Sequence, residues 1–203
     1  MYKINKKQVT TLILAGGKST RMDGQDKGLL NVEGKYIINY IINIAEKYSK
    51  KIIVNVNRNF EKYEAMGLVI CKDVLDDFQG PLAGIYSGLM MIDTEYMITL
   101  PCDGPFIRDI FFKKMISSDN NADINVAHDG KRIQPVYCMI KKSVTNNLES
   151  FLKTDQRKID KWFENNITNL IDFSQYNEMF VNINDKNELE KYKKQILNNI
   201  KNE

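Results

Sequence analysis

The sequence has few histidines, few cysteines and no long apolar run, and each shortage excludes a class of function. His128 is the only histidine, so catalysis by histidine has a single candidate. Cys71, Cys102 and Cys138 are widely dispersed, at spacings that no common Cys/His zinc motif uses. Three dispersed cysteines are typical of reduced thiols in a cytosol.

The chain also lacks the apolar segments that direct a protein into or across a membrane. No stretch reaches about 18 consecutive apolar residues, the length that identifies a membrane-spanning helix. The amino-terminal segment has positive residues but only a short apolar run before Gly16 and Gly17, unlike a signal peptide. We therefore expect a cytoplasmic protein that neither spans nor binds a membrane.

A strong charge of one sign is missing as well, because the net charge is only +3 over 203 residues. A nucleic-acid binder usually carries a basic stripe, so no nucleic-acid partner is expected. A small anionic ligand needs only a local cluster of cations and remains possible. The apolar content of 43% is typical of a folded globular chain.

Apolar, β-branched segments alternate with segments of helical period in the first half of the chain. Strands are expected at residues 9–14, 51–56, 68–71 and 96–100, and helices at residues 36–48, 81–91 and 107–116. Such alternation indicates βαβ units, with a parallel sheet covered by helices on both faces.

The second half is less regular. Strands at 124–127 and 133–140 flank an Asp129-Gly130 turn, which predicts a hairpin and therefore a mixed, mostly parallel sheet. Helices are expected from Ser143 to 153 and from Thr154 or Asp155 to 162, with a last strand at 180–183. Asp185 and Glu188 form a capping box for a closing helix. No repeat or linker divides the chain, so residues 1–203 are expected to form a single domain.

The stretch "LILAGGKSTRMDGQDKGLL", residues 12–30, contains Gly-Lys-Ser-Thr and so invites comparison with phosphate-binding motifs. A P-loop needs glycine where this chain has Leu12, five positions before Gly17. The dinucleotide fingerprint needs glycine where it has Lys18 and Arg21. Neither template fits.

An anion site remains physically reasonable after the first strand. Gly16 and Gly17 allow the backbone to approach a ligand closely, and Lys27 is a suitable point charge for a phosphate. Open α/β sheets bind ligands at this end of their strands. An ordinary turn with solvated lysines would explain the composition equally well.

Polar residues end the other expected strands: Asn55, Asn57 and Arg58, then Asp73, then Asp103. Parallel strands end at one edge of a sheet, so these side chains should converge, although Asn and Asp are also common turn formers. Asp103 lies between two prolines that stiffen its loop. A lone carboxylate beside phosphates is a usual holder of Mg²⁺.

Two further features have structural explanations. The spacing of four between Gly84 and Gly88 predicts close packing of one helix face. Cys102 has no base near it in the sequence and is interpreted as a structural thiol.

A family resemblance joins these segments. The motifs "LAGGKSTRMDGQDKGLL", "VNVNR", "DVLDDFQGPLAG", "PCDGPF", "QPVY" and "FVNIN" occur in the order found in molybdenum cofactor guanylyltransferases. The chain resembles this family from about residue 9 to about residue 190. The resemblance implies a Rossmann-like nucleotidyltransferase fold, with a mixed, mostly parallel sheet and helices on both faces. It also implies transfer of GMP from GTP to molybdopterin, with release of pyrophosphate.

The resemblance implies a role for each matching residue. Nucleotide binding falls to the backbone of Leu14, Ala15, Gly16 and Gly17, with Lys27 at the phosphates, Asn55 and Asp73 at the guanosine, and Asp103 at Mg²⁺. Lys27, Asp103 and Arg21 would stabilise the charge of the reacting phosphates. The pterin side would comprise Gln134, Pro135, Asn182 and Asn184. The implied partners are GTP, molybdopterin or its molybdenum form, and molybdoenzymes or cofactor-handling proteins.

Two positions depart from the family pattern. Asp23 stands where the family typically has glycine, and its carboxylate would repel a triphosphate unless it points away or helps to place the metal. Tyr36 replaces a frequent proline at a helix start. Alternative functions are a molybdopterin cytidylyltransferase, a sugar-phosphate nucleotidyltransferase, or a nucleotide-binding regulatory module without catalysis, which only Asp23 favours.

Overall fold

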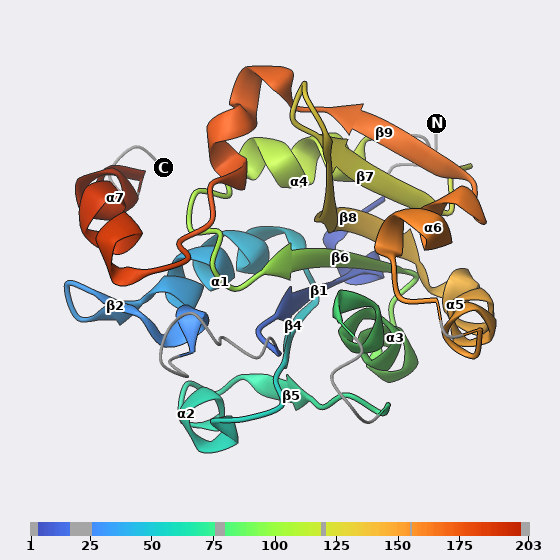
Figure 1. The fold of residues 1–203 in the computed structure, drawn as a ribbon, viewed down its shortest axis with the longest axis horizontal. Coiled ribbons are helices and arrows are strands. Elements are labelled where there is room, and N and C mark those ends of the chain that lie inside the picture. Colours follow the sequence, from blue (N-terminus) through green and yellow to red (C-terminus); the bar gives the residue numbers. More distant parts are fainter. Residues whose placement is uncertain (1–3, 17–25, 76–79, 119–120, 155, 200–203) are drawn as a thin grey trace.

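The computed structural model describes residues 4–16, 26–75, 80–118, 121–154 and 156–199, and these residues build a seven-stranded sheet (Figure 1). Its strands are, in order across the sheet, β5 (Val69–Cys71), β4 (Lys51–Asn55), β1 (Val9–Leu14), β6 (Tyr96–Pro101), β8 (Ile133–Lys141), β7 (Ile124–His128) and β9 (Thr168–Asp172). Strand β8 is antiparallel to both of its neighbours, and the other pairings are parallel. The predicted mixed, mostly parallel sheet is confirmed.

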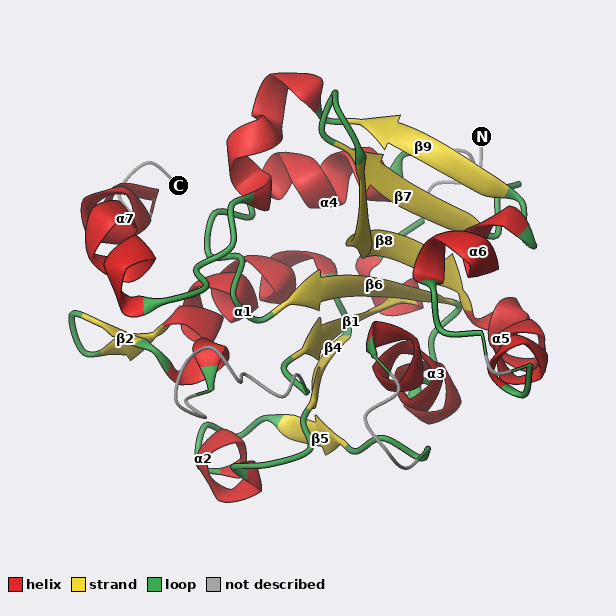
Figure 2. Cartoon of the chain, viewed as in Figure 1, coloured by secondary structure: helices red, strands yellow, loops and turns green. Residues whose placement is uncertain are grey.

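Helices cover both faces of this sheet, as expected (Figure 2). One face packs against α1 (Ile37–Tyr48) and α4 (Asp109–Ile116), and the other against α3 (Pro81–Met91), α5 (Thr145–Leu152) and α6 (Ile159–Glu164). The remaining elements are α2 (Phe60–Glu64), α7 (Lys186–Asn199), the small hairpin of β2 (Asn31–Val32) and β3 (Lys35–Tyr36), and 3₁₀ helices at Lys6–Gln8, Lys27–Leu29, Lys142–Val144 and Ser174–Phe180.

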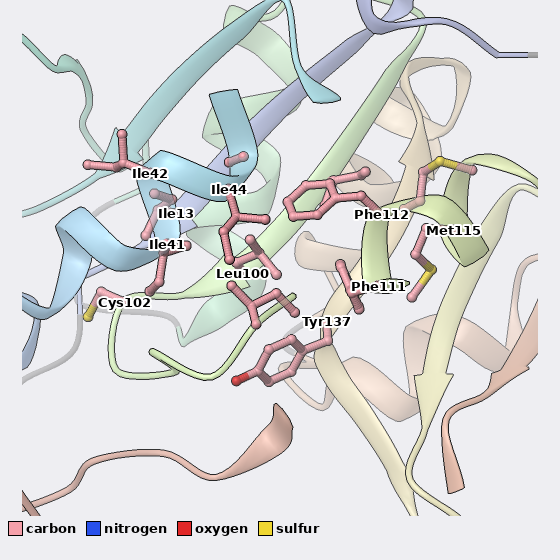
Figure 3. Close-up of a cluster of buried hydrophobic side chains, with 14 of the residues drawn as sticks. Ile13, Ile41, Ile42, Ile44, Leu100, Cys102, Phe111, Phe112, Met115 and Tyr137 are labelled. Carbon is pink, nitrogen blue, oxygen red and sulfur yellow. The ribbon is translucent and has the colours of Figure 1, made fainter. Parts of the chain in front are cut away.

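Alternating side chains of the central strands supply two cores. In β1, Val9 and Ile13 join the core under α1 and α4, whereas Leu12 joins the core under α3 and α5. Successive side chains of a strand point to opposite faces, so one apolar strand serves both layers. Figure 3 shows the first core, where Phe111 and Phe112 of α4 meet the isoleucines of α1.

A third core explains the position of the closing helix. Val32 of β2, Ile37 of α1 and Ile196 of α7 are buried together. Helix α7 therefore lies beside the β2–β3 hairpin, although the two are far apart in the sequence (Figure 1). An ion pair of 2.7 Å between Lys193 Nζ and Glu33 Oε1 connects the same two elements at the surface.

The glycines of α3 pack closely against the sheet, as the sequence predicts. A Cβ atom at Gly84 would lie 2.4 Å from Asn55 Oδ1 and 2.7 Å from Leu14 Cδ2, and one at Gly88 would lie 2.7 Å from Leu12 Cδ2. Real Cβ atoms do not approach neighbours this closely. Glycine is therefore required here by the approach of helix to strands.

Replacing Gly84 with alanine should consequently lower the free energy of unfolding by about 1–3 kcal/mol, the usual cost of overpacking a core. Urea denaturation monitored by circular dichroism measures this loss. Ser150→Ala, at an exposed position of α5, is the control and should change stability by less than about 0.5 kcal/mol. Equal stability of the Gly84 and Ser150 variants would contradict the packing argument.

The predicted strand at 180–183 is wrong. Phe180 ends a 3₁₀ helix, and Ile183 donates its N–H to the carbonyl of Asp103 at 2.8 Å instead of entering the sheet. The apolar side chains that resembled a strand are buried in the first and third cores. Strand β9 was missed because it lies at the sheet edge, where Leu170 remains 55% exposed.

The sequence predicts correctly that the segments of α5, α6 and α7 are helical, but it predicts their first residues less accurately. Helix α5 begins at Thr145 rather than after Ser143, because a 3₁₀ turn intervenes, and α6 begins only at Ile159. Position 155 lies outside the described residues. At α7, Asp185 Oδ1 accepts the N–H of Glu188 at 2.8 Å, but the carboxylate of Glu188 accepts from the N–H of Asn184. Half of the expected capping box is therefore present.

Within the described residues, no helix combines the length and apolar character that crossing a membrane requires.

Candidate active site

The carboxyl ends of four parallel strands meet at one edge of the sheet. Leu14 of β1 is paired with Asn55 of β4 on one side and with Pro101 of β6 on the other. Asn55 is in turn paired with Cys71 of β5. The residues that follow these strands therefore converge as the sequence predicts, and we call this edge the rim.

The first glycine of the turn lies at the rim. The carbonyl of Leu14 accepts from the N–H of Cys102, and the N–H of Ala15 donates to the carbonyl of Asn55. These two groups complete the sheet, and Gly16 is the next residue. A Cβ atom at Gly16 would lie 3.0 Å from both Asn55 Oδ1 and Asn57 Nδ2, so Gly16 packs tightly on their amides. Gly17, Arg21 and Asp23 lie outside the described residues.

Asp73 is held in place by two asparagines of the neighbouring strand end. Asn55 Nδ2 donates to Asp73 Oδ1, and Asn57 Nδ2 donates to Asp73 Oδ2, both at 2.7 Å. The backbone N–H of Asp73 donates to Asn57 Oδ1 at 3.2 Å. Asn55 is buried, and its amide also donates to the carbonyl of Cys71. The carboxylate is therefore fixed in orientation beside Gly16.

Lys27 contacts a residue from each of two distant segments. Its Nζ lies 2.9 Å from Asp103 Oδ2 and 2.7 Å from Asn184 Oδ1. The side chains of Lys27 and Asp103 are 24% and 11% exposed, so both charges are largely shielded from water. Asn184 is held by its own N–H, which donates to Glu188 of α7. Phosphate oxygens would find a positioned cation here.

Asn182 belongs to the same neighbourhood. Its Oδ1 accepts from the hydroxyl of Tyr137 at 3.1 Å, while the ring of Tyr137 packs in the first core (Figure 3). A Cβ atom at Gly104 would lie 2.2 Å from that hydroxyl, so the residue after Asp103 must be glycine. Sequence reasoning missed Tyr137 and Gly104, although both occur within the motifs "QPVY" and "PCDGPF".

Gln134 and Pro135 lie on β8, near its hairpin with β7. Gln134 Nε2 donates to Asp129 Oδ2 at 2.6 Å across the turn. The pairing of β7 with β8 shifts here, from Cys138 opposite Val126 to Gln134 opposite Ala127. Proline has no N–H for a strand ladder, which accounts for an irregularity at Pro135.

The thiols are buried and free, and none is suited to nucleophilic attack. Burial, with Asp103 adding to it, raises the pKa of Cys102. Burial also raises the pKa of Cys71 to about 11 and of Cys138 to about 12. The reactive thiolate is therefore scarce at neutral pH. The interpretation of Cys102 as a structural thiol agrees with this environment.

The native protein should accordingly resist alkylation. At pH 8, which lies below all three raised pKa values, iodoacetamide should leave Cys71, Cys102 and Cys138 unmodified in the folded state and modify all three in urea. Mass spectrometry of the intact protein counts the added groups. Rapid modification of Cys102 without denaturant would show that its thiol is reachable and ionised.

Known proteins are similar to this chain in sequence and in fold. The model of the MobA-like NTP transferase domain matches residues 11–170. A molybdenum cofactor guanylyltransferase of Vibrio atlanticus is 38% identical over 186 residues, which are 91% of this chain and 95% of the relative. Another, from Shewanella halifaxensis, is 36% identical over 179 residues, which are 87% and 90% of the two chains.

A solved structure has the same fold. It is molybdopterin-guanine dinucleotide biosynthesis protein A from Archaeoglobus fulgidus, with a TM-score of 0.76, 16% identity, and coverage of 93% of this chain and 99% of that one. The sheet topology, the glycine turn and the polar rim define an enzyme of the nucleotidyltransferase class. Within that class, the chain belongs to the MobA-like NTP transferase family, as a relative of the molybdenum cofactor guanylyltransferases.

Nucleotidyltransferases generally depend on a divalent metal, and the rim fits one. Asp103 offers carboxylate oxygens at 8% residue exposure, beside a cation that also suits phosphate. In the part of the chain that the structure describes, no three His, Cys, Asp or Glu side chains cluster as a preformed metal cage. A divalent cation can be held at such a site by one carboxylate, with substrate phosphates and water completing its coordination.

Proposed function

We propose that this enzyme transfers GMP from GTP to the terminal phosphate of molybdopterin and releases pyrophosphate. The observation that carries the proposal is the shielded pair of Lys27 and Asp103 at the rim, 2.9 Å apart, in a chain of this family. Two relatives that are 38% and 36% identical to this chain over most of their length are named molybdenum cofactor guanylyltransferases, which supports guanylyl transfer in particular.

The reaction needs no general base. A phosphate monoester has a second pKa near ~6, so the attacking phosphate of molybdopterin is already largely ionised at neutral pH. The enzyme must instead align two anions and reduce their repulsion. His128, the only histidine, accepts the N–H of Gly130 in the β7–β8 turn, a structural use of its Nδ1.

The negative charges of the reacting phosphates would be neutralised at the rim by a lysine and by a metal ion that a carboxylate holds. Lys27 would contact the phosphates of GTP while Asn184 holds its ammonium group in place. Asp103 would hold Mg²⁺ together with phosphate oxygens, and the bound ion would supply Lewis-acid stabilisation of the charge on the α-phosphate and pyrophosphate. We assign Arg21, outside the described residues, to the same neutralisation.

We assign recognition of the guanosine and of the pterin to residues on either side of Lys27 and Asp103. Asp73, fixed by Asn55 and Asn57, would face the guanosine, since an oriented carboxylate can accept two N–H groups of a base. The backbone groups of residues 14–17 would bind the nucleotide. Asn182, Asn184, Gln134 and Pro135 are assigned to the pterin side; of these, Asn184 already contacts Lys27.

We also propose that residues 1–203 form one transferase domain, because the third core joins β2 and α1 with α7. The enzyme would work in the cytoplasm, where its three unpaired thiols remain reduced, without nucleic acid or membrane. Molybdoenzymes or cofactor-handling proteins would receive its product.

The direct test is incubation with GTP, Mg²⁺ and molybdopterin, with identification of products by mass. We expect the guanine dinucleotide of molybdopterin and one pyrophosphate for each molecule formed. Competition with CTP, ATP and UTP tests the base, and preferential use of CTP would identify a cytidylyltransferase instead. Nucleotide binding without pyrophosphate release would indicate a module that lacks catalysis.

A further inference from the structure

Lys27 is preceded by a buried carboxylate that the reaction does not use. Asp26 is 6% exposed, and its Oδ1 accepts the N–H of Gly28 at 3.1 Å, which caps the 3₁₀ turn Lys27–Leu29. The same oxygen accepts the hydroxyl of Tyr63 of α2 at 2.7 Å. Tyr63 is fully buried, so this hydrogen bond lies in the interior.

The turn is also confined sterically from two sides. A Cβ atom at Gly28 would lie 3.0 Å from the hydroxyl oxygen of Tyr63 and 3.1 Å from Cys102 Cβ. Cys102 is itself fixed, because its N–H donates to the carbonyl of Leu14 at 3.0 Å. Gly28 thus lies between a tyrosine of α2 and the residue that precedes Asp103.

Asp26, Gly28, Tyr63 and Cys102 therefore form one unit, which we call the clamp. We propose that Tyr63 is a positioning residue, which through Asp26 and Gly28 holds Lys27 in register with Asp103. The inference rests on the proposed function, since it concerns alignment of the cation assigned to the phosphates. Within the described residues, Tyr63 itself forms no hydrogen bond with Lys27 or Asp103.

The chemistry of the hydroxyl suits this role. Burial, supported by the nearby Cys102 and Asp26, raises the pKa of Tyr63, so the group stays protonated and donates throughout the working pH range. A hydrogen bond to a carboxylate is stronger than one between neutral groups. Asn59 Nδ2 lies 3.5 Å from the other oxygen of Asp26, a longer and weaker contact than the 2.7 Å hydrogen bond from Tyr63.

Tyr63→Phe removes the donor and keeps the ring. A shift of about 1 Å in a group that orients the reactants can lower the rate about 100-fold. In this variant the turn Lys27–Leu29 keeps its cap from Asp26 and loses only the support of Tyr63, so we expect a smaller loss of about 10-fold in rate. We expect this loss mainly in kcat for guanylyl transfer. Tyr40→Phe is the matched control, because Tyr40 is also buried and donates its hydroxyl to the carbonyl of Val32 at 3.3 Å, away from the clamp. Its kcat should stay at the wild-type value.

A double-mutant cycle distinguishes positioning from general destabilisation. If Tyr63 acts through Lys27, Tyr63→Phe should have almost no further effect on kcat in a Lys27→Met background. Equal losses in both backgrounds would overturn the proposal. So would a loss in Tyr40→Phe as large as that in Tyr63→Phe.

Crystal structures of the wild type and of Tyr63→Phe supply a measurement that does not depend on the reaction. The clamp predicts that Lys27 Nζ leaves its position 2.9 Å from Asp103 Oδ2 in the variant. An unchanged position would overturn the clamp even for an active enzyme. A wild type that forms no dinucleotide would overturn the proposed function, and the structures would still decide the clamp.

A second variant covers the case in which Tyr63→Phe does not fold. Asp26→Asn keeps the shape and an acceptor oxygen for Gly28 but removes the charge that strengthens the tyrosine bond. It should show a smaller loss of kcat, again absent in the Lys27→Met background. A loss that persists in that background would contradict the clamp.

Discussion

Asp103→Ala should lower kcat for guanylyl transfer by about 10²–10³, the scale for removing one electrostatic stabiliser from an active site. The carboxylate is shielded at the rim, where a charge acts more strongly than in water, and Ala removes both the partner of Lys27 and the proposed metal ligand. Steady-state rates across a series of Mg²⁺ concentrations measure the effect. The loss should be largest when Mg²⁺ is limiting.

The control is a second Lys–Asp pair of the same chain. Lys50 Nζ and Asp93 Oδ2 lie 2.7 Å apart at the opposite end of the strands, with side chains 47% and 67% exposed. An exposed pair contributes little to stability, and Asp93→Ala should leave kcat unchanged. Wild-type turnover by Asp103→Ala at limiting Mg²⁺ would falsify the metal role.

Lys27→Met should weaken GTP binding and slow transfer, for a combined loss of about 10²-fold or more in kcat/KM. Methionine keeps an unbranched apolar side chain but removes the ammonium group that contacts Asp103 and Asn184 and would meet the phosphates. Calorimetric titration with GTP separates the effect on binding from the effect on the chemical step. Lys27→Arg should recover only part of the activity, because a planar guanidinium does not reproduce a compact ammonium.

Lys50→Met is the corresponding control, since it removes a lysine charge from the exposed pair. It should bind GTP and turn over as the wild type does. If Lys27→Met behaves in the same way, the lysine has no part in the site, and the rim would have to bind phosphates through other groups.

Local sequence pattern was sufficient for the parallel strands β1, β4, β5 and β6 and for helices α1, α3 and α4, but it did not predict α2 or the β2–β3 hairpin. Residues 9–14 and 81–91 were predicted with the bounds that β1 and α3 have, because their apolar periods and the proline at the helix start are local signals. The convergence of Asn55 and Asp73 followed as well, since parallel strands end at one edge. Their mutual hydrogen bond of 2.7 Å did not, because side-chain orientation depends on packing.

The two wrong strand predictions concern segments whose conformation depends on tertiary burial and not on the periodicity of their apolar residues. Residues 180–183 are rich in aromatic and β-branched side chains, as strands often are, yet the N–H of Ile183 donates to the carbonyl of Asp103 and does not enter the sheet. Residues 168–172 form an edge strand, with Leu170 exposed, and so carry little apolar alternation. Neither outcome can be read from a window of a few residues.

By itself, the sequence determined the fold class, the glycine turn, the set of polar strand ends and, through its motifs, the family. These features are local, or follow from the common direction of parallel strands. Only the tertiary structure decided how the chemistry is held. Lys27 meets Asn184 across a separation of 157 residues, and Asp26 meets Tyr63 across 37. Such contacts arise because the cores bring α2, α7 and the strand ends together, and no local pattern encodes the distance between them.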